Sequence, residues 1–395
     1  MTAPLEGLIV LDLTRVLAGP YCGMMLADYG ANIYKVEPPE VGDDSRAFGP
    51  FIEKQGKKES AYFMSLNRNK RSMVLNFKQQ SHVELFKEMV KKADIVLENY
   101  KPGTMEKFGL GYDALEKINP RIIYAACSGF GHTGPYTEKP AYDIIVQAMG
   151  GVMSITGSEG GDPTRIGASI GDITAGIFTA YGIMMALYHR QTSGKGQKVD
   201  VGMLDCQVAI LENAIARYFT SGTSPTPLGN RHPSITPFAS FTAKDGYIIV
   251  GAGNDRLWKK LCEVLNRPEW LQDPDYKTNG DRTNNVKKLQ IQMDEVMKDR
   301  TIDEWMKLLE DAGVPCAPIN TVERVVNDPQ VNFRDMIVEL DHPVAGKQKM
   351  AGAPVKMSLT PGSVRTSAPL LGQHTNELLK EMFGWDDKTI EEKLK

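Results

Sequence analysis

An aspartate at the start of an apolar helical stretch is the residue best placed to do chemistry. It stands in Gly171-Asp172-Ile-Thr-Ala-Gly176, and small residues recur over the next two turns at Ala175, Gly176, Ala180 and Gly182. A carboxylate at a helix N-terminus is stabilised in its ionised form by the helix dipole and exposed N–H groups, and an ionised aspartate can act as a covalent nucleophile. Aspartate is also a favoured N-cap residue without any catalytic role. The pattern fits both interpretations.

Two short basic clusters are candidates for contacts to phosphate. They are Arg68-Asn-Lys70-Arg71 and Lys101-Pro-Gly103-Thr-Met-Glu-Lys107, and they lie at ends of predicted strands, where ligands bind in open parallel sheets. A solvated basic face is the alternative. The whole chain has 46 Lys and Arg against 49 Asp and Glu, with interspersed signs, so neither a nucleic-acid nor a membrane partner is indicated.

Other catalytic motifs are missing or incomplete in the sequence. Gly129-Phe-Gly131-His-Thr-Gly134 matches G-x-G-x-x-G, but Pro135 and a polar run follow it, so no helix N-terminus is predicted to receive a pyrophosphate. The six histidines show no H-x-x-H spacing and no G-x-S-x-G occurs. The sequence therefore lacks the motifs that would indicate a metallohydrolase or a serine hydrolase. Five cysteines without C-x-x-C argue against a zinc site or a disulfide framework.

The same cysteine pattern favours a reducing compartment. The N-terminus has no basic region before an apolar run, so a secretory signal is not indicated. The longest apolar stretch, residues 173–188, is shorter than a membrane span requires. We expect a cytoplasmic protein, or the mature form of an organellar one.

The elements that must position Asp172 belong to a predicted α/β fold. The 395 residues, 42% of them apolar, are enough for two or three domains. In the first 200 residues, short runs rich in Val, Ile and Leu alternate with helical patterns, which is typical of a mainly parallel, doubly wound sheet. The predicted strands are 8–13, 32–37, 72–77, 94–99, 121–127 and 198–203.

A second, smaller unit is predicted after a segment rich in Ser, Thr, Pro and Gly at 221–229. Strands at 238–242 and 247–252 are separated by Lys244-Asp-Gly246, which is a hairpin signal. Thr301-Ile-Asp-Glu304 has the spacing of a capping box, and Gly313 is placed to end the helix that follows. This pattern indicates an α+β domain.

Eleven separate segments, spread in order along the chain, match motifs of one known family. In the first half they are 5–20, 30–37, 67–72, 98–103, 128–135 and Gly171-Asp172, and in the second half 229–233, 251–254, 313–320, 328–330 and 371–375. Together they resemble the class III CoA-transferases over essentially the whole chain. The N-terminal run, Gly229-Asn-Arg-His-Pro and the C-terminal segment are most similar to the branch that acts on dicarboxylates, such as succinyl-CoA:glutarate CoA-transferases.

The resemblance implies a particular architecture. It implies a large Rossmann-like CoA-binding domain at 1–205, completed by 345–395, and a small α+β domain at 231–318. The two are joined by a linker at 206–230 and a return linker at 319–344. It also implies a homodimer whose two ring-like chains are interlocked.

The resemblance further implies a mechanism. Asp172 matches the family's covalent nucleophile, which attacks an acyl-CoA donor to form a mixed anhydride and then an aspartyl-CoA thioester. The acceptor acid repeats these steps in reverse, so acyl activation is conserved and no metal, nicotinamide or flavin is needed. Gly251 and Gly253 match a loop that shields the intermediate from water, a role suited to the conformational range of glycine.

The resemblance also suggests binding residues. It places Val16 and Ala18 near the pantetheine arm, Arg71 and Lys101 at phosphates, and Asn99, Tyr100, Lys107 and Phe108 around the nucleotide. Several relatives have arginine where this chain has Pro38-Pro39, which puts the nucleotide contacts in doubt. A dicarboxylate would need a further cation, for which Arg15 and Arg231 are candidates because guanidinium binds carboxylate through two hydrogen bonds.

Two alternatives remain open. The α-methylacyl-CoA racemases share the fold and pair the aspartate with a histidine at the position of Tyr142, which we otherwise assign to CoA binding. A tyrosine with an ordinary pKa near 10 is a poor acid/base partner, so we favour transfer. A silent CoA-binding homologue is the other alternative, and the presence of Asp172 counts against it.

Overall fold

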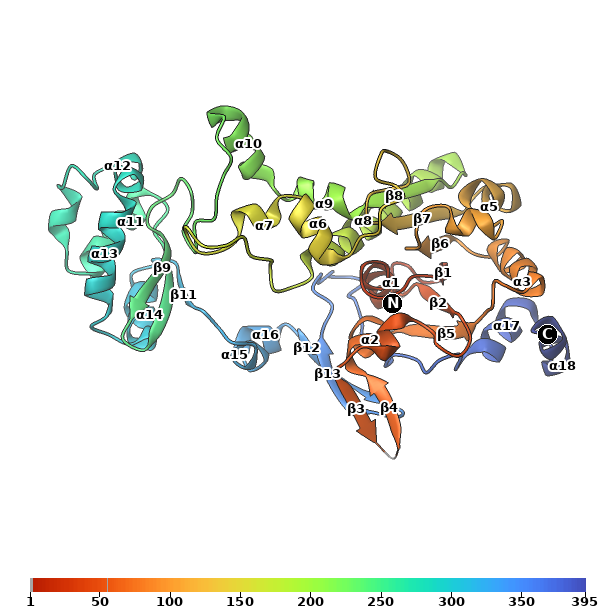
Figure 1. Ribbon diagram of the computed structural model, residues 1–395. Helices are drawn as coiled ribbons and strands as arrows, with labels where there is room; N and C mark the ends of the chain where they lie inside the picture. The colour runs from red at the N-terminus through yellow and green to blue at the C-terminus, as the bar shows by residue number, and fades with distance from the viewer. Residues whose placement is uncertain (1–2, 55) are drawn as a thin grey trace. The chain divides into compact units, whose positions relative to one another are not determined.

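A computed structural model describes residues 3–54 and 56–395 of the chain (Figure 1). They form two compact units. The larger unit comprises Met1–Val152, Arg165–Ser221 and Pro329–Lys395, and the smaller comprises Met153–Thr164 and Gly222–Asp328, apart from the residues outside the described ranges. The chain therefore passes between the units at four points, including a short excursion at 153–164 that the sequence pattern does not predict.

The larger unit is built on a six-stranded sheet whose neighbouring strands are all parallel. Its strands are β1 (Ile9–Asp12), β2 (Asn32–Glu37), β5 (Lys70–Val74), β6 (Ile95–Glu98), β7 (Ile123–Ser128) and β8 (Lys198–Gly202). Every predicted strand of this sheet is present, although β5 begins and ends earlier than the predicted range 72–77. The central strands β6 and β7 are fully buried, and buried parallel strands are recognisable as nearly continuous apolar runs. The α/β class with a parallel sheet is confirmed.

Helices cover both faces of the sheet. One face packs in a core with α3 (Gln80–Val90), α5 (Tyr112–Ile118), α17 (Thr375–Phe383) and α18 (Asp387–Lys393). The other packs in a core with α1 (Ala18–Asp28) and α8 (Ile170–Ser193). The strand order β5-β2-β1-β6-β7-β8 changes direction between β1 and β6. Ligands of open α/β sheets bind at such a point, beyond the carboxyl ends of the strands.

Helix α8 is longer than the apolar stretch that predicted it. With 24 residues it is long and apolar enough, by length and composition, to cross a membrane, and half of its apolar window is buried inside the larger unit. A core helix of a folded unit fits that description. The opposite face of α8 exposes apolar side chains, among them Ile177, Tyr181, Met185 and Tyr188.

The C-terminal segment closes one edge of this sheet. The Ser72 N–H of edge strand β5 lies 3.3 Å from Nδ1 of His374, and the His374 N–H donates to the Ser72 carbonyl. The Val74 N–H donates to Oγ1 of Thr375. These contacts occupy backbone groups that an edge strand would otherwise leave unpaired.

The remaining elements of the larger unit are short. They are η1 (Asp44–Ala47), β3 (Phe51–Lys54), β4 (Lys57–Ser60), α2 (Ala61–Leu66), α4 (Thr104–Lys107), α6 (Asp143–Met149), α9 (Met203–Ala209), α10 (Glu212–Ser221), α16 (Pro329–Phe333), β12 (Ile337–His342) and β13 (Gly346–Ala351), while α7 (Val152–Ile155) continues into the smaller unit. The hairpins β3–β4 and β12–β13 carry many charged residues, so no apolar alternation indicates them.

The smaller unit contains a three-stranded antiparallel sheet in the order β11-β10-β9. Its elements are β9 (Phe238–Ala243), β10 (Gly246–Gly251), α11 (Asp255–Val264), η2 (Pro268–Leu271), α12 (Asn279–Asn284), α13 (Val286–Met297), α14 (Ile302–Asp311), β11 (Cys316–Pro318) and α15 (Val322–Val326). The predicted capping box opens α14, where Thr301 accepts from the Glu304 N–H and Glu304 accepts from the Thr301 N–H.

The two predicted linkers contain regular structure. Residues 206–230 include most of α9 and all of α10, and residues 319–344 include α15, α16 and β12. Local hydrogen bonds stabilise some of these helices. The Thr321 side chain, for example, accepts from the Arg324 N–H at the start of α15. Such short helices leave a weak periodic signal in the sequence.

Candidate active site

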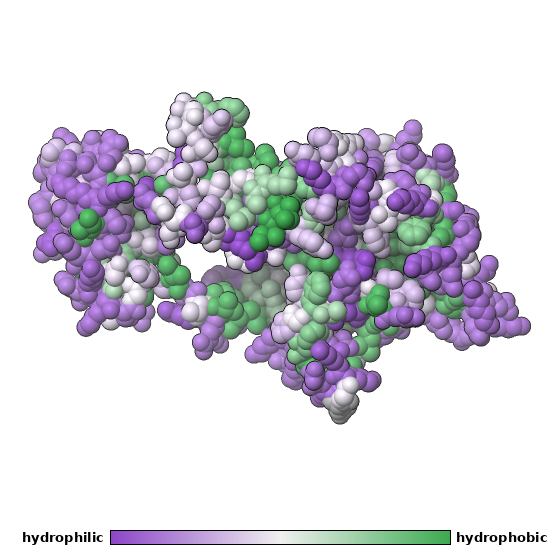
Figure 2. Space-filling view, viewed as in Figure 1, coloured by the Kyte–Doolittle hydropathy of each residue, from purple (hydrophilic) through white to green (hydrophobic). Residues whose placement is uncertain are grey.

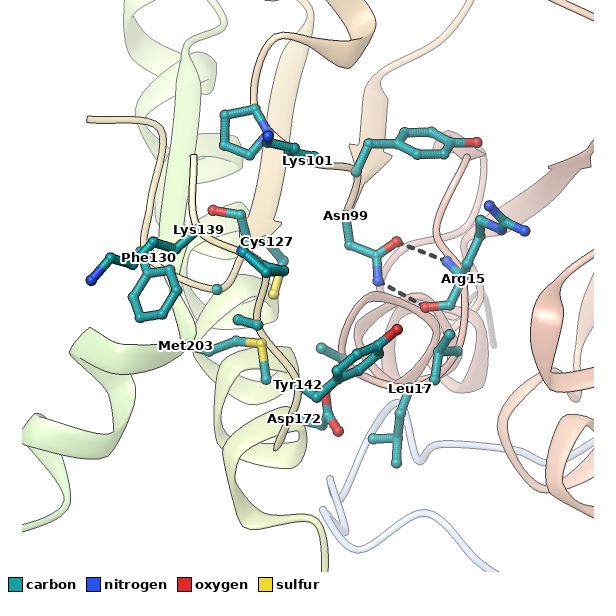
Figure 3. A pocket seen from close by; sticks show the side chains of 18 of the residues that line it. Arg15, Leu17, Asn99, Lys101, Cys127, Phe130, Lys139, Tyr142, Asp172 and Met203 are labelled. Carbon is teal, nitrogen blue, oxygen red and sulfur yellow. Dashed lines mark hydrogen bonds between the residues drawn. The ribbon is translucent and has the colours of Figure 1, made fainter. Parts of the chain in front are cut away.

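A cavity of about 360 Å³ lies in the larger unit (Figure 3). Loops that follow β1, β6 and β7 contribute to its wall, so it lies at the point where the strand order changes direction. The residues singled out from the sequence that line it are Arg15, Val16, Ala18, Asn99, Tyr100, Lys101, Tyr142 and Asp172. The topology therefore brings together eight positions spread over 158 residues of sequence, from 15 to 172.

Asp172 projects from the first turn of α8, and it is not the N-cap. The helix begins at Ile170 and the N-cap residue is Ser169, so the N-cap interpretation of Asp172 is wrong. Within residues 3–54 and 56–395, no group donates a hydrogen bond to the Asp172 carboxylate. A half-buried carboxylate without a partner carries an unmet desolvation cost. Its side chain is available to a ligand in the cavity.

The surroundings of Asp172 disfavour its charge. Burial, together with the nearby carboxylate of Asp143, raises the pKa of Asp172 to about 7. This is opposite to the stabilisation of the ionised form that the helix dipole alone predicts. At neutral pH a substantial fraction of Asp172 is therefore ionised, and its carboxylate is poorly solvated. Such a carboxylate is a stronger nucleophile than an aspartate in water.

Asp143 is fixed next to Asp172 by hydrogen bonds of its own. Its Oδ1 accepts from the Gly171 N–H at 2.8 Å, and its Oδ2 accepts from Nε2 of Gln147 at 2.8 Å. Nη2 of Arg165 lies 3.4 Å from the same Oδ2. Asp143 thereby ties the start of α6 to the start of α8 and holds its own charge close to Asp172.

Asn99 holds one wall of the cavity. Its Oδ1 accepts from the Arg15 N–H at 2.8 Å and its Nδ2 donates to the Arg15 carbonyl at 2.7 Å, as the dashed lines in Figure 3 mark. Both polar atoms of the amide are thus used within the protein. The geometry gives Asn99 a supporting role in the wall, where the resemblance suggested contact with the nucleotide.

Cations surround the cavity. The Arg15 guanidinium pairs with Asp44 at 2.5 Å and points away from Asp172 in Figure 3. Lys101 is more than half exposed and pairs with Glu138 at 2.8 Å. Lys139, which sequence analysis did not single out, also lines the cavity. It lies in the polar run after the 128–135 segment, and that position is the signal that could have identified it.

Three other predicted CoA-binding residues are not among the residues that line the cavity. Arg71 pairs with Glu377 at 3.0 Å and Glu381 at 2.8 Å, both on α17. Lys107 ends α4, and the Phe108 that follows packs against Phe77 with ring centroids 5.8 Å apart. The sequence around Arg71 does not predict these ion pairs, because their partners on α17 lie about 300 residues later in the chain.

The smaller unit holds the remaining predicted residues. Gly251 is the last residue of β10, and Gly253 follows it just before the N-cap of α11, Asn254. Arg231 pairs with Glu159 at 3.2 Å, so the excursion at 153–164 supplies its anionic partner. The two glycines, Arg231 and Glu159 all belong to the smaller unit.

Tyr142 lies beside Asp172 at the cavity mouth (Figure 3). Its side chain is 73% exposed and makes no capping bond to α6. No histidine is among the described residues that line the cavity. A second acid/base group of the kind that racemisation needs is therefore missing from this wall. Across residues 3–54 and 56–395, no cluster of three or more His, Cys, Asp or Glu side chains could hold a metal ion.

Comparison with known proteins identifies the family of the chain. The family described as CoA-transferase family III matches residues 5–375. Human succinyl-CoA:glutarate CoA-transferase is 41% identical over 392 residues, which cover 99% of this chain and 89% of that protein. Acetyl-CoA:oxalate CoA-transferase of Acetobacter aceti is 42% identical over 380 residues, covering 96% of this chain and 95% of that protein.

A solved structure is similar to this chain in both sequence and fold. A CAIB/BAIF family protein from Brucella suis is 39% identical, with a TM-score of 0.86 over 97% of this chain and 100% of that one. The resemblance seen in the sequence is confirmed by the family match and by both curated relatives. The chain belongs to CoA-transferase family III and is an enzyme of this class.

Proposed function

We propose that the protein transfers coenzyme A from succinyl-CoA or a similar donor to a dicarboxylic acid, with Asp172 as the covalent nucleophile. The observation that carries the proposal is the Asp172 carboxylate. It faces a cavity without any hydrogen-bond partner among the described residues, and its pKa is raised to about 7. Relatives named succinyl-CoA:glutarate and succinyl-CoA:mesaconate CoA-transferases support this choice of substrates.

The reaction has four balanced steps. The Asp172 carboxylate attacks the thioester carbonyl of the donor, which forms a mixed anhydride and releases CoA thiolate. The thiolate attacks the aspartyl carbonyl, which releases the donor acid and leaves an aspartyl-CoA thioester. The acceptor carboxylate then attacks this thioester, giving a second anhydride and CoA thiolate. Finally the thiolate attacks the acceptor's carbonyl, which gives the new thioester and restores the Asp172 carboxylate.

The residues around Asp172 have supporting tasks in this scheme. Val16 and Ala18 lie along the pantetheine arm, and Tyr100 and Lys101 bind the nucleotide end, with Lys139 as a further phosphate contact. These positions line the same cavity as Asp172. Because both intermediates can be hydrolysed, water must be excluded from them. We assign that shielding to the loop that contains Gly251 and Gly253.

The acceptor's second carboxylate needs a cation. Arg15 lines the cavity, and its Nε is buried without a hydrogen-bond partner among the described residues. Guanidinium binds carboxylate through two parallel hydrogen bonds, so we assign Arg15 to the distal carboxylate, with Arg231 as the second candidate. Asp44 pairs with the guanidinium and orients it.

The enzyme acts as a homodimer of interlocked chains in the cytoplasm. The exposed apolar face of α8 supports the dimer, as do exposed apolar side chains on α6 and α10, where Figure 2 shows a hydrophobic area. A single folded chain rarely leaves a large apolar surface uncovered. Gel filtration with light scattering should give the mass of two chains, and the mass of a single chain would contradict the dimer.

The decisive experiment looks for the covalent intermediate. The protein is incubated with succinyl-CoA, digested, and examined by mass spectrometry for CoA or an acyl group on the peptide that contains Asp172. Asp172→Asn should give no adduct and no transfer, while Asp205→Asn, at an exposed position in the first turn of α9, should behave as wild type.

Two results would count against the proposal. The absence of any adduct across a broad panel of acyl-CoA donors would favour a silent CoA-binding protein. Deuterium incorporation from solvent at the α-carbon of a 2-methylacyl-CoA, without exchange of CoA between acids, would favour racemisation.

A further inference from the structure

Four charged side chains are fully buried directly behind the cavity wall. Lys35 pairs with Asp43 at 2.8 Å, and Lys70 pairs with Asp12 at 2.9 Å, with all four side chains at 0% exposure. We call these residues the buried charge cluster. Although burial alone would raise it, the Lys35 ammonium holds the pKa of Asp43 well below its usual range.

The buried charge cluster binds the loop that forms the wall. Nζ of Lys35 donates to the Thr14 carbonyl at 2.9 Å, and Oδ1 of Asp43 accepts from the Val16 N–H at 3.0 Å. Nζ of Lys70 donates to the carbonyl of Pro20, at the start of α1, at 2.9 Å. The loop from residue 14 to the start of α1 is therefore held from behind at several backbone atoms.

The loop contains a strained residue. Val16 has a φ of 68°, in the left-handed region that a β-branched residue rarely adopts. Such strain persists only where surrounding contacts determine the conformation. Here the contacts are those of Asp43 to the Val16 N–H and of Asn99 to both backbone groups of Arg15.

The same loop lies against the helix that carries Asp172. Gly176 follows Asp172 by four residues, so the two share a face of α8. A Cβ atom at Gly176 would lie 2.6 Å from the carbonyl oxygen of Ala18. The distance between the loop and α8 is therefore fixed by direct backbone contact, and the loop's conformation determines the shape of the cavity in front of Asp172.

We infer that Lys35 and Asp43 are positioning residues, which hold Val16 in its strained conformation so that the wall facing Asp172 is preformed before substrate binds. A buried ion pair contributes little net stability compared with apolar residues of similar size, so stability alone does not account for two such pairs behind one loop. The inference rests on the proposed function, because it assigns these residues a task in that reaction.

The test removes one pair and then relieves the strain by other means. The double variant Lys35→Met/Asp43→Ala leaves no unpaired charge from that pair. We expect kcat/KM for transfer to fall by about tenfold or more, and hydrogen exchange at residues 14–18 to become faster. Val16→Gly alone measures the loss of the pantetheine contact. In that background the double variant should lower kcat/KM much less than it does in the wild type, because glycine adopts a positive φ without strain. Asp43→Asn is a milder version if the double variant does not fold.

The matched control removes another buried pair, Arg68 with Asp28, whose atoms lie 2.7 Å apart. Arg68 also donates to the carbonyl of Ala351 at the end of β13, and the pair makes no hydrogen bond to residues 14–18 among the described residues. Arg68→Met/Asp28→Ala should therefore keep kcat/KM within about threefold of wild type.

Two results would overturn the inference. One is wild-type kcat/KM and wild-type exchange at 14–18 in the folded Lys35/Asp43 variant. The other is an equal fall in kcat/KM when Lys35→Met/Asp43→Ala is introduced into Val16→Gly and into the wild type. A wild-type protein that performs no transfer would instead count against the proposed function, while the exchange measurement would still test the positioning of the loop.

Discussion

Replacing Asp172 with asparagine is expected to abolish transfer and, at the same time, to stabilise the protein. Asparagine has nearly the shape of aspartate but cannot form the anhydride, so kcat should fall by more than about 1,000-fold. It also carries no charge. Since burial and Asp143 disfavour the ionised form of Asp172, the wild-type fold is destabilised whenever that carboxylate is ionised.

The size and sign of the stabilisation follow from the pKa. In the folded protein the pKa of Asp172 is raised from 3.8 to about 7. The destabilisation is therefore absent below pH 3.8, grows as the pH rises between the two values, and is complete above about pH 7. At about 1.4 kcal/mol per pKa unit, it amounts to about 1.5 kcal/mol at pH 5 and about 4 kcal/mol at pH 8.

Thermal unfolding at the two pH values tests this reasoning. For a protein of this length, 1 kcal/mol corresponds to roughly 1.2 °C in Tm, so Asp172→Asn should raise Tm by about 5 °C at pH 8 and by about 2 °C at pH 5. Asp205→Asn replaces another first-turn aspartate, one that is exposed, and should leave Tm nearly unchanged.

An Asp172→Asn protein that is no more stable than wild type at pH 8 would refute the reasoning. So would a stabilisation that is equal at the two pH values, because the destabilisation is attributed to ionisation alone. Residual transfer near the wild-type rate would refute the assignment of the nucleophile independently of stability.

Three further predictions concern the neighbours of this site. Asp143→Asn removes a charge that raises the pKa of Asp172, so the acidic limb of the pH profile of kcat/KM should move to lower pH; a limb that stays or moves upward contradicts the assigned coupling. Arg15→Gln should raise KM for dicarboxylate acceptors by about tenfold and for monocarboxylates little, which steady-state kinetics with paired acceptors would show. Gly176→Ala places a methyl group 2.6 Å from the Ala18 carbonyl oxygen, so urea unfolding should reveal a loss of about 1–3 kcal/mol.

The central strands of the parallel sheet could be predicted from sequence because they are buried on both faces. β7, for instance, consists only of buried residues, and such runs need no knowledge of the tertiary contacts. The charged hairpin β3–β4 lacks this signal. Its formation depends on cross-strand pairing, which no local pattern specifies.

The candidate site was predictable in its residue types and not in its geometry. Asp172 was found from its place before an apolar helix, but which residue caps that helix depends on where the first turn closes, and the structure puts Ser169 there. The left-handed conformation of Val16 contradicts the local preference of valine. It is imposed by Asp43 and Asn99, which are distant in the sequence.

The closure of the β5 edge by residues 372–375 has a consequence for biosynthesis. Ser72 and Val74 are translated early, but the backbone atoms and side chains that pair with their edge come from His374 and Thr375. His374 follows Ser72 by 302 positions in the chain. The nascent chain must therefore carry an open strand edge until this later segment has been synthesised, and it is during this interval that we expect it to depend most on chaperones.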